Sequence, residues 1–597
     1  MDILGVSCFY HDAAAALLRD GQIVAATMEE RLTRKKHDNG FPARAIDFCL
    51  EQGGIQGPDL DYVVFYEKPM VKVGRILQTA LGTFPRSWDF WREAVTAYVS
   101  EKFWIKSLLQ HHLGVRPEQI LFCDHHMSHA ASAFFASPFD EAAVITVDGV
   151  GEWTTTTMGM ARGTWDGSGE NAIDLFWEQR FPHSIGLLYS AFTAFLGFHV
   201  NDGEYKVMGM APYGEPTYVD EVRKLISIND DGSFALNMDY FAYHHSVSRS
   251  FNGKFIDLFG EPRMHSDDFF TAKSAPHRVG ETEAVRRNQH YADIARSIQQ
   301  VTEEALLAMA NALHHKTGAR KLVMAGGVAL NSVANFRLFS ETPFEDVYIQ
   351  PAAGDDGGAL GAALWAYHLV LGQPRKLVMS DTYLGQRFSN AEIRAFFDAE
   401  GIPYEEYEDD DRLLDRVVDE ILDQKVIGLF QGRYEWGPRA LGNRSILADP
   451  RRAEMKDIIN TKIKFREPFR PFAPVIPEER AAEYFDLGRA EGQYPQRFML
   501  MVSDVLESRQ AEIPAVSHMG TGRLQTVRRE WNPRYYDIIT AFGQKTGTPV
   551  LMNTSFNLRG EPIVSSPANA WWTFSHSEID WLVIGSFLVG KDAKKRS

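Results

Sequence analysis

Three segments of this 597-residue chain share one local pattern, in which a short apolar run leads directly into a glycine turn with a polar or acidic residue. The first is the run 144–147 followed by DGVGE, and the second is 322–324 followed by AGGVALN. The third is VYIQPAA followed by GDDGGALGAA at 354–363. Each reads as a strand, a turn and the start of a helix, and glycine turns let phosphate oxygens approach the backbone. The pattern predicts an α/β fold with one nucleotide site assembled from several turns.

A histidine pair precedes the first of these turns. His125 and His129 lie four residues apart in DHHMSHAASAFF, and a helix would place both on one face. Such a pair is a weak signal alone, because histidines often lie in cores with one satisfied hydrogen bond. Asp148 adds a carboxylate at a strand end beside Gly149 and Gly151, and buried acids need a cation or donors. The combination predicts a metal site next to the glycine turns.

Composition narrows the class of protein. The formal net charge of −17 argues against nucleic acid as the main partner. Three cysteines without a CxxC pattern fit a reducing cytoplasm and exclude a thiolate zinc site. No apolar run reaches the about 18 residues of a membrane span. We therefore expect a soluble, cytoplasmic protein without a membrane partner, and the acidic charge and apolar surface stretches are compatible with a homodimer.

Patterning along the chain predicts two domains. The first begins with a strand at 2–8 and a hairpin, 13–19 and 22–28, around Asp20-Gly21, which is how actin-like ATPase domains begin. A long amphipathic helix is expected at 289–316. Gly and Pro mark a boundary near 371–380, and helices at 389–400 and 411–424 with a strand at 426–430 follow it. The aromatic stretch 70–112 is expected to be helical, and the irregular stretch 228–285 reads as an insertion that shapes an acceptor pocket.

A second group of candidate site residues is basic. Residues 431–470 hold ten Lys/Arg against five Asp/Glu, so the segment is locally +5 inside an acidic chain. Arg439 and Arg444 each follow a glycine-containing turn. Arginines in such turns favour an anion pocket over a merely hydrated surface, because the guanidinium fork matches phosphate or carboxylate oxygens. Ser555 and Asn557 add neutral donors at another strand end. This part of the chain predicts an anion site.

The chain resembles the O-carbamoyltransferases of the nodulation-protein and cephalosporin-carbamoylation type, which include tobramycin carbamoyltransferase. The motifs stand in family order from end to end: FYHDAAAAL, EERLTRKKH, HHMSHAASA, VDGVGE, MGMAPYG, AGGVALN, GDDGGALGAA, GPRALGNRSIL, RPFAP, LQTV and NTSFNLRGEPIV. The resemblance implies an actin-like (ASKHA, Kae1-like) domain at 1–372 and a YrdC-like α/β domain at 378–597.

The resemblance also implies roles for individual residues. His11 is implied as the base, and a divalent ion, iron(II) or else Mg²⁺ or Mn²⁺, is implied on His125, His129, Asp148 and Asp355. The nucleotide-binding candidates are Lys36, Gly149, Gly151, Glu152, Gly326, Gly327, Asn331 and Asp356. The carbamoyl phosphate site is implied at Arg439, Lys464, Arg470, Arg523, Ser555 and Asn557.

The implied reaction converts carbamoyl phosphate and ATP to carbamoyl-adenylate, whose carbamoyl group passes to a hydroxyl of a small natural-product molecule in antibiotic or toxin biosynthesis. Three alternatives stay open: a tRNA threonylcarbamoyl-type modifying enzyme, a metal-dependent actin-fold kinase or phosphohydrolase, and a non-catalytic assembly or chaperone-like protein. Tight tRNA binding would favour the first, ADP formation from ATP alone the second, and indifference to His125→Ala the third.

Overall fold

The computed structural model describes residues 1–92 and 104–591. The chain divides into two compact units, one of Met1–Ala26 with Asn39–Val378 and the other of Thr27–Asp38 with Met379–Ser597. The break at 378 falls inside the 371–380 stretch, where Gly and Pro interrupt the preceding helix. The assignment of the short piece Thr27–Asp38 to the second unit is not predicted by the sequence pattern.

The first unit contains two five-stranded sheets with the same internal order. One has the order β3-β2-β1-β4-β5 and the other β12-β11-β6-β7-β8. In each sheet the first strand in sequence is central, pairs antiparallel with the second and parallel with the fourth. This duplicated order is that of the actin-like fold. The strands are β1 (Asp2–Ser7), β2 (Ala14–Arg19), β3 (Gln22–Met28), β4 (Tyr62–Phe65), β5 (Ile120–Phe122), β6 (Glu141–Val147), β7 (Thr154–Arg162), β8 (Ala172–Arg180), β11 (Lys321–Ala325) and β12 (Asp346–Ile349).

The turn between β2 and β3 confirms the predicted hairpin. Asp20 and Gly21 both have positive φ, 51° and 82°, as a two-residue type I′ turn requires. The register pairs Ser7 with Ala14, so the loop that carries His11 and Asp12 leaves the sheet at the carboxyl end of β1.

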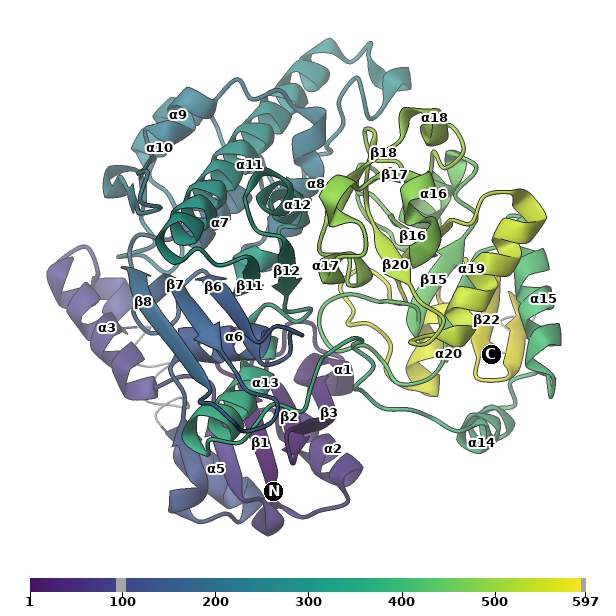
Figure 1. The fold of residues 1–597 in the computed structure, drawn as a ribbon. Coiled ribbons are helices and arrows are strands. Elements are labelled where there is room, and N and C mark those ends of the chain that lie inside the picture. Colours follow the sequence, from purple (N-terminus) through teal and green to yellow (C-terminus); the bar gives the residue numbers. More distant parts are fainter. Residues whose placement is uncertain (93–103, 592–597) are drawn as a thin grey trace. The chain divides into compact units, whose positions relative to one another are not determined.

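Two short helices lie between the sheets of this unit, α6 (His125–Phe134) and α13 (Asp355–Trp365) (Figure 1). Gly361 permits their close packing, because a Cβ there would lie 1.8 Å from the backbone oxygen of Ser128. Both helices begin at the same end of the sandwich as the carboxyl end of β6. Their first residues are therefore brought next to Asp148, which follows β6 directly.

Further helices pack in this unit, and two further strands form a small hairpin where the segment read as an insertion begins. The predicted helix at 289–316 exists and is longer, because its first turns begin at Thr282. The helical prediction for 70–112 is confirmed at its two ends, and 93–103 lies outside the described residues. The elements are α2 (Ala43–Gly53), α3 (Pro69–Gly82), α5 (Ile105–Leu113), α7 (Ile185–Phe195), α8 (Glu204–Met210), α9 (Val219–Arg223), β9 (Ile226–Ile228), β10 (Phe234–Leu236), α10 (Gly253–Phe259), α11 (Thr282–Thr317) and α12 (Ser332–Glu341).

The second unit is built on an eight-stranded mixed sheet of order β13-β23-β22-β14-β15-β21-β16-β20. Apolar side chains of α15 and α19 pack on one face, and those of α14 and α20 pack in the core cluster of the other face. A three-stranded sheet, β17-β18-β19, adjoins it. The YrdC-like assignment of this unit stays a prediction.

The elements of the second unit are α1 (Glu29–Thr33), α14 (Asn390–Glu400), β13 (Glu405–Glu406), α15 (Asp410–Leu422), β14 (Ile427–Phe430), β15 (Arg444–Ala448), α16 (Glu454–Ile458), β16 (Ala473–Pro477), β17 (Phe485–Asp486), α17 (Tyr494–Arg497), β18 (Val502–Val505), α18 (Glu507–Gln510), β19 (Thr521–Arg523), β20 (Gln525–Val527), α19 (Pro533–Thr546), β21 (Leu551–Ser555), α20 (Pro567–Ser575), β22 (Trp581–Ile584) and β23 (Phe587–Gly590). Among the described residues of the whole chain, no helix combines the length and apolar character needed to cross a membrane.

Candidate functional site

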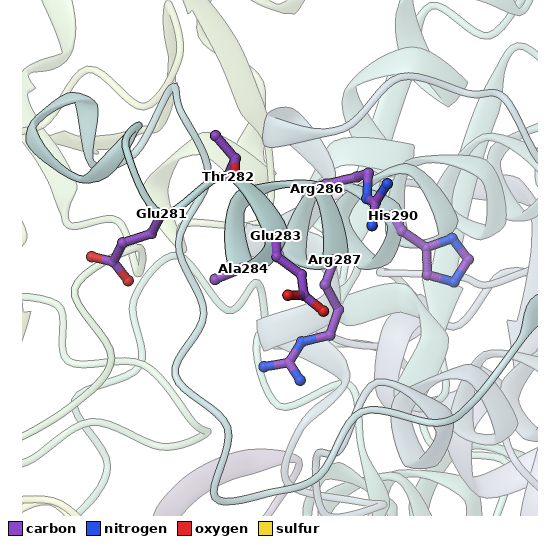
Figure 2. Close-up of a pocket in the computed structure, with 7 residues that line it drawn as sticks. All are labelled: Glu281, Thr282, Glu283, Ala284, Arg286, Arg287 and His290. Atoms are coloured by element: carbon purple, nitrogen blue, oxygen red, sulfur yellow. The ribbon is translucent and has the colours of Figure 1, made fainter.

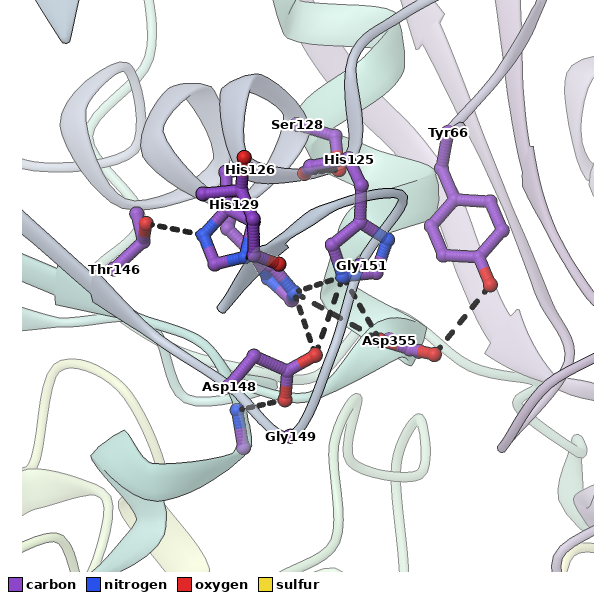
Figure 3. A network of polar contacts seen from close by, with 12 residues as sticks. Tyr66, His125, His126, Ser128, His129, Thr146, Asp148, Gly149, Gly151 and Asp355 are labelled. Carbon is purple, nitrogen blue, oxygen red and sulfur yellow. Dashed lines mark hydrogen bonds and ion pairs between the residues drawn. The ribbon is translucent and has the colours of Figure 1, made fainter. Parts of the chain in front are cut away.

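Four side chains meet at the helix starts between the two sheets of the first unit. His125 and Asp355 are the first residues of α6 and α13, His129 is one turn further along α6, and Asp148 follows β6. One ligand atom from each lies within 4.8 Å of all the others, and all four residues are buried (Figure 3). The structure thus brings together the four residues for which the sequence and the family resemblance imply a metal.

The geometry of this cluster suits a cation. The Nε2 atoms of His125 and His129 are 3.2 Å apart, and His125 Nε2 is 3.2 Å from Asp148 Oδ2. His129 Nε2 is 3.7 Å from Asp355 Oδ1. Ligand atoms bound at about 2.1 Å around a tetrahedral ion would be about 3.4 Å apart. Two imidazole nitrogens cannot both act as acceptors toward each other, whereas a cation satisfies both.

Neighbouring groups orient the ligands. The Gly327 N–H donates to Asp148 Oδ1 at 3.0 Å, and the Tyr66 hydroxyl donates to Asp355 Oδ2 at 3.4 Å. Each bond leaves the other carboxylate oxygen directed at the cluster (Figure 3). His126 bonds Thr146 Oγ1 at 2.6 Å and so fixes the first turn of α6. Supporting contacts of this kind are the usual second layer of a metal site. Sequence reasoning missed Tyr66 and His126, although His126 stands inside the same motif.

The pKa values of the four side chains are shifted in different directions. Burial would lower the pKa of His125, but the hydrogen bond to Asp148 and the charge of Asp355 raise it to about 9. Burial and the charge of His125 lower the pKa of His129 to about 3. Burial raises the pKa of Asp355 to about 7, while the hydrogen bond from His125 holds the pKa of Asp148 far below its usual range in spite of burial. One imidazole and one carboxyl therefore hold protons near neutral pH, and a metal would have to displace them.

The glycine turns pack directly on this cluster. A Cβ on Gly151 would lie 2.6 Å from His125 Cδ2, so only glycine leaves the imidazole in place. Gly326 has a φ of 95°, and its neighbour Gly327 supplies the N–H that holds Asp148. Gly149 is open by comparison, since a Cβ there would have no atom nearer than 3.8 Å.

Three polar residues that are candidates for nucleotide binding differ in how far hydrogen bonds within the protein already occupy them. Glu152 accepts the backbone N–H of His125 at 3.5 Å and that of Lys68, and burial raises its pKa to about 6. Asn331 caps α12 by accepting the Ala334 N–H at 3.2 Å. Asp356 is buried with a pKa of about 7, raised by burial and then by Asp12, and its Oδ2 has no hydrogen-bond partner among the described residues. Of the three, Asp356 keeps the most capacity to meet a ligand.

His11 lies on the loop after β1, as predicted. Its Nδ1 is 2.6 Å from Asp12 Oδ2, and its Nε2 is 2.8 Å from the carbonyl oxygen of Asn201. The acidic partner at Nδ1 was not assigned from the sequence, although it is the adjacent residue. A carboxylate behind an imidazole is the arrangement that orients a general base.

A second cluster forms in the other unit around Lys464. Its buried ammonium donates to Asn557 Oδ1 at 2.7 Å and to Ser555 Oγ at 3.2 Å. Burial lowers the pKa of Lys464 far below its usual value, and the charges of Arg466, Arg470 and Lys36 lower it further. A bound anion would offset this repulsion. The structure therefore brings Lys464, Ser555 and Asn557 into contact, with Arg470 and Lys36 acting on the same ammonium.

The turn that carries Arg439 is tied to the chain just after Arg523, the last residue of β19. Gln525 Nε2 donates to the Leu441 carbonyl oxygen at 3.0 Å, which links points two residues beyond each arginine. Asn553 Nδ2 donates to the Ala440 oxygen at 3.2 Å and joins the same turn to β21, the strand that ends at Ser555. Arg444 instead is fully buried, and its guanidinium donates to backbone oxygens such as that of Asn443 at 2.8 Å. It holds the turn and is not placed as an anion ligand.

Lys36 reaches this cluster through the short piece of chain that joins the second unit. Arg31 donates to the Gly437 oxygen at 2.8 Å, and Arg34 donates to the Ile563 oxygen at 2.7 Å. These bonds attach α1 and the residues after it to the turns that precede Arg439 and follow Asn557. The structure thus assigns Lys36 to the unit that holds the basic cluster.

A surface hollow of about 730 Å³ lies elsewhere on the first unit, beside the first turns of α11 (Figure 2). Acidic and basic side chains alternate around it: Glu281, Thr282, Glu283, Ala284, Arg286, Arg287 and His290. It contains none of the predicted site residues, and its exposed, mixed charges do not define a ligand. The buried clusters above are the better candidates.

Comparison with known proteins agrees with the two-part architecture. The family described as Carbamoyltransferase N-terminus matches residues 2–364, and Carbamoyltransferase C-terminus matches residues 418–591. The chain belongs to the carbamoyltransferase family. It is an enzyme that transfers carbamoyl groups.

Individual relatives cover nearly the whole chain. An uncharacterized protein of Synechocystis is 45% identical over 99% of this chain and 97% of its own length. Nodulation protein NolNO of Sinorhizobium fredii is 38% identical over 98% of this chain and 79% of its own, and nodulation protein NolO of Bradyrhizobium diazoefficiens is 37% identical over 78% and 79%. Among solved structures, the (R)-2-hydroxyglutaryl-CoA dehydratase component A of Acidaminococcus fermentans aligns with a TM-score of 0.29 at 15% identity over 61% of this chain and 97% of that one. The actin-like assignment rests on the strand order instead.

Proposed function

We propose that this carbamoyltransferase is ATP-dependent, forms carbamoyl-adenylate from carbamoyl phosphate in the second unit, and transfers the carbamoyl group to a hydroxyl of a small molecule in the first. The observation that carries the proposal is the presence of two clusters of different chemistry. One is the buried His125, His129, Asp148 and Asp355 group, and the other is the cationic group around Lys464. Each suits a different half of such a reaction.

The second unit would activate the carbamoyl group. Carbamoyl phosphate and ATP are both polyanions, so bringing them together requires several cations. Water releases phosphate from carbamoyl phosphate, and an oxygen of the resulting carbamate attacks the α-phosphorus of ATP. A phosphorus–oxygen bond forms, and pyrophosphate leaves with its electron pair. Lys464, Arg470, Arg439 and Arg523 would bind the phosphate oxygens, and Ser555 and Asn557 would orient the carbamoyl amide.

The first unit would carry out the transfer. A divalent ion held by the two histidines and two aspartates would act as a Lewis acid toward the phosphate of the leaving AMP. Iron(II) is the ion implied by the family and suits imidazole donors, whereas Mg²⁺ and Mn²⁺ would rely mainly on the two carboxylates. His11, oriented by Asp12, takes the proton of the acceptor hydroxyl as its oxygen bonds to the carbamoyl carbon. A general base of this kind contributes roughly 10²–10⁴-fold.

Mass spectrometry of reactions that contain ATP, carbamoyl phosphate and a panel of alcohols tests the proposal. We expect a carbamate mass gain on one class of alcohol, together with one AMP and one pyrophosphate per product. Carbamoyl transfer at full rate without ATP would refute the adenylate route. Modification of tRNA in place of the alcohols would point to the tRNA-modifying alternative.

A further inference from the structure

The hydrogen-bond partners of the two His11 ring nitrogens show that this residue cannot act as a base in this conformation. A carbonyl oxygen can only accept a hydrogen bond, so His11 Nε2, 2.8 Å from the Asn201 oxygen, must carry a hydrogen. Nδ1 is directed at Asp12 Oδ2, at 2.6 Å. The ring is therefore either an imidazolium beside an ionised Asp12 or a neutral ring whose Nδ1 accepts from a protonated Asp12. In both cases Nε2 has no lone pair to offer a hydroxyl.

The turn that holds the Asn201 carbonyl is itself fastened by one carboxylate. Glu204, the first residue of α8, accepts the Asn201 N–H at 3.0 Å with Oε1 and the Gly203 N–H at 3.1 Å with Oε2. The Ser190 hydroxyl donates to Oε1 at 2.9 Å and ties the carboxylate to α7. Asn201 has a φ of 65°, so its carbonyl direction depends on a left-handed backbone conformation. Without Glu204 the turn would lose these three hydrogen bonds and keep the one from the Asp202 N–H to the His199 oxygen at 3.3 Å.

The same turn contacts the segment read as an insertion. The rings of His199 and His265 have centroids 4.7 Å apart, and His265 Nδ1 bonds the Gly197 oxygen at 3.0 Å. A molecule bound beside the insertion would therefore also meet the turn that carries Asn201. This connects occupancy by an acceptor to the position of the turn.

We propose that residues 199–203, fastened by Glu204, form a latch whose Asn201 carbonyl occupies the position that the acceptor hydroxyl must take on His11. The inference rests on the proposed function and deepens it. An arriving alcohol displaces the carbonyl, and the Nε2 proton passes to solvent water, so that Asp12 holds Nδ1–H and Nε2 accepts the hydroxyl proton. The oxygen of the alcohol bonds to the carbamoyl carbon, the bond from that carbon to the AMP oxygen breaks, and AMP leaves with the electron pair. Until then the latch keeps His11 from activating water, which would waste the adenylate.

The test uses the full-length protein with ATP, carbamoyl phosphate and no acceptor. Glu204→Ala and Asn201→Ala each loosen the latch, the second while keeping every charge, because alanine disfavours the left-handed conformation of residue 201. Both should raise acceptor-independent formation of AMP and ammonia, Glu204→Ala by roughly tenfold or more, since a general base is worth 10²–10⁴-fold. Adding His11→Ala to Glu204→Ala should remove the gain. Glu392→Ala, which removes a helix-start carboxylate from α14, is the matched control and should change neither AMP formation nor ammonia formation.

A second readout does not depend on turnover. With ¹⁵N-labelled histidine, and with His11→Ala to assign the signal, wild-type His11 should show a protonated Nε2, and Glu204→Ala should shift it toward an unprotonated Nε2. An unprotonated Nε2 in the wild type would overturn the latch whether or not the protein makes carbamoyl-adenylate. Unchanged hydrolysis in both loosened variants, with pyrophosphate release at the wild-type rate, would overturn it as well. Loss of pyrophosphate release from the wild type would instead count against the proposed function, and the nitrogen signal would still decide the latch.

Discussion

Protons and metal should compete at the His125–Asp355 cluster, and the pKa values give the size of the effect. His125 has a pKa of about 9 and Asp355 a pKa of about 7, so both must lose protons before a cation binds. Affinity for a divalent ion should therefore rise with pH up to about 9. Between pH 8 and pH 6, protonation of His125 alone lowers the affinity for the ion about tenfold per pH unit. Protonation of Asp355 lowers the affinity about tenfold more below pH 7. The total is about 10³-fold, or about 4 kcal/mol of binding free energy.

The assay is a titration with Mn²⁺ at pH 6, 7 and 8 under constant ionic strength, with proton release measured in buffers of different ionisation enthalpy. Roughly two protons should be released per ion at pH 6 and about one at pH 8. Asp355→Asn should weaken binding at every pH and remove one of the two protons released at pH 6. An affinity that changes less than about tenfold between pH 6 and 8, or that rises on acidification, would refute this reasoning.

Two substitutions test the support of each cluster separately. Gly151→Ala should weaken Mn²⁺ binding, because its Cβ would lie 2.6 Å from His125 Cδ2. The expected loss is about 10- to 100-fold, the usual effect of disturbing the surroundings of metal ligands. In the control Gly149→Ala the Cβ has no contact nearer than 3.8 Å, and Mn²⁺ should bind normally. Equal titrations for the two variants would contradict the packing argument. Glu435→Gln should slow pyrophosphate release by about 10- to 100-fold, because Glu435 Oε1 accepts the backbone N–H groups of Leu441, Asn443 and Arg444 at 2.8–3.2 Å and so shapes the turn after Arg439. Wild-type release, or a loss of metal affinity in that variant, would rule this role out.

The sequence predicted the parts of the site that depend on local periodicity. Helical spacing placed His125 and His129 on one face, and strand ends placed Asp148 beside them. Asp355 was reached only through the family resemblance, because nothing in GDDGGALGAA alone says which strand end it will meet. The packing of α13 on α6 at Gly361 creates that meeting, and it joins residues far apart in the chain.

Other features could not be predicted, because they depend on loop conformation or on long-range hydrogen bonds. The Asn201 carbonyl reaches His11 across 190 residues, and no side-chain pattern reports where a backbone oxygen points. The segment Thr27–Asp38 continues the first hairpin in sequence yet bonds Gly437 and Ile563. Asn331, in contrast, could have been read as a helix cap, since asparagine directly before a helical pattern favours that role.

The most direct test of the account separates its two half-reactions with one isotope. Wild type, His129→Ala and Lys464→Met are each mixed with ATP and ¹⁴C-carbamoyl phosphate in the presence of an alcohol identified as an acceptor, and the products are quenched within one turnover. His129→Ala should form labelled carbamoyl-adenylate but little carbamate ester, while Lys464→Met should form neither. Labelled adenylate at the wild-type level in Lys464→Met, or its absence in a folded His129→Ala protein, would contradict the assignment of activation and transfer to two separate clusters.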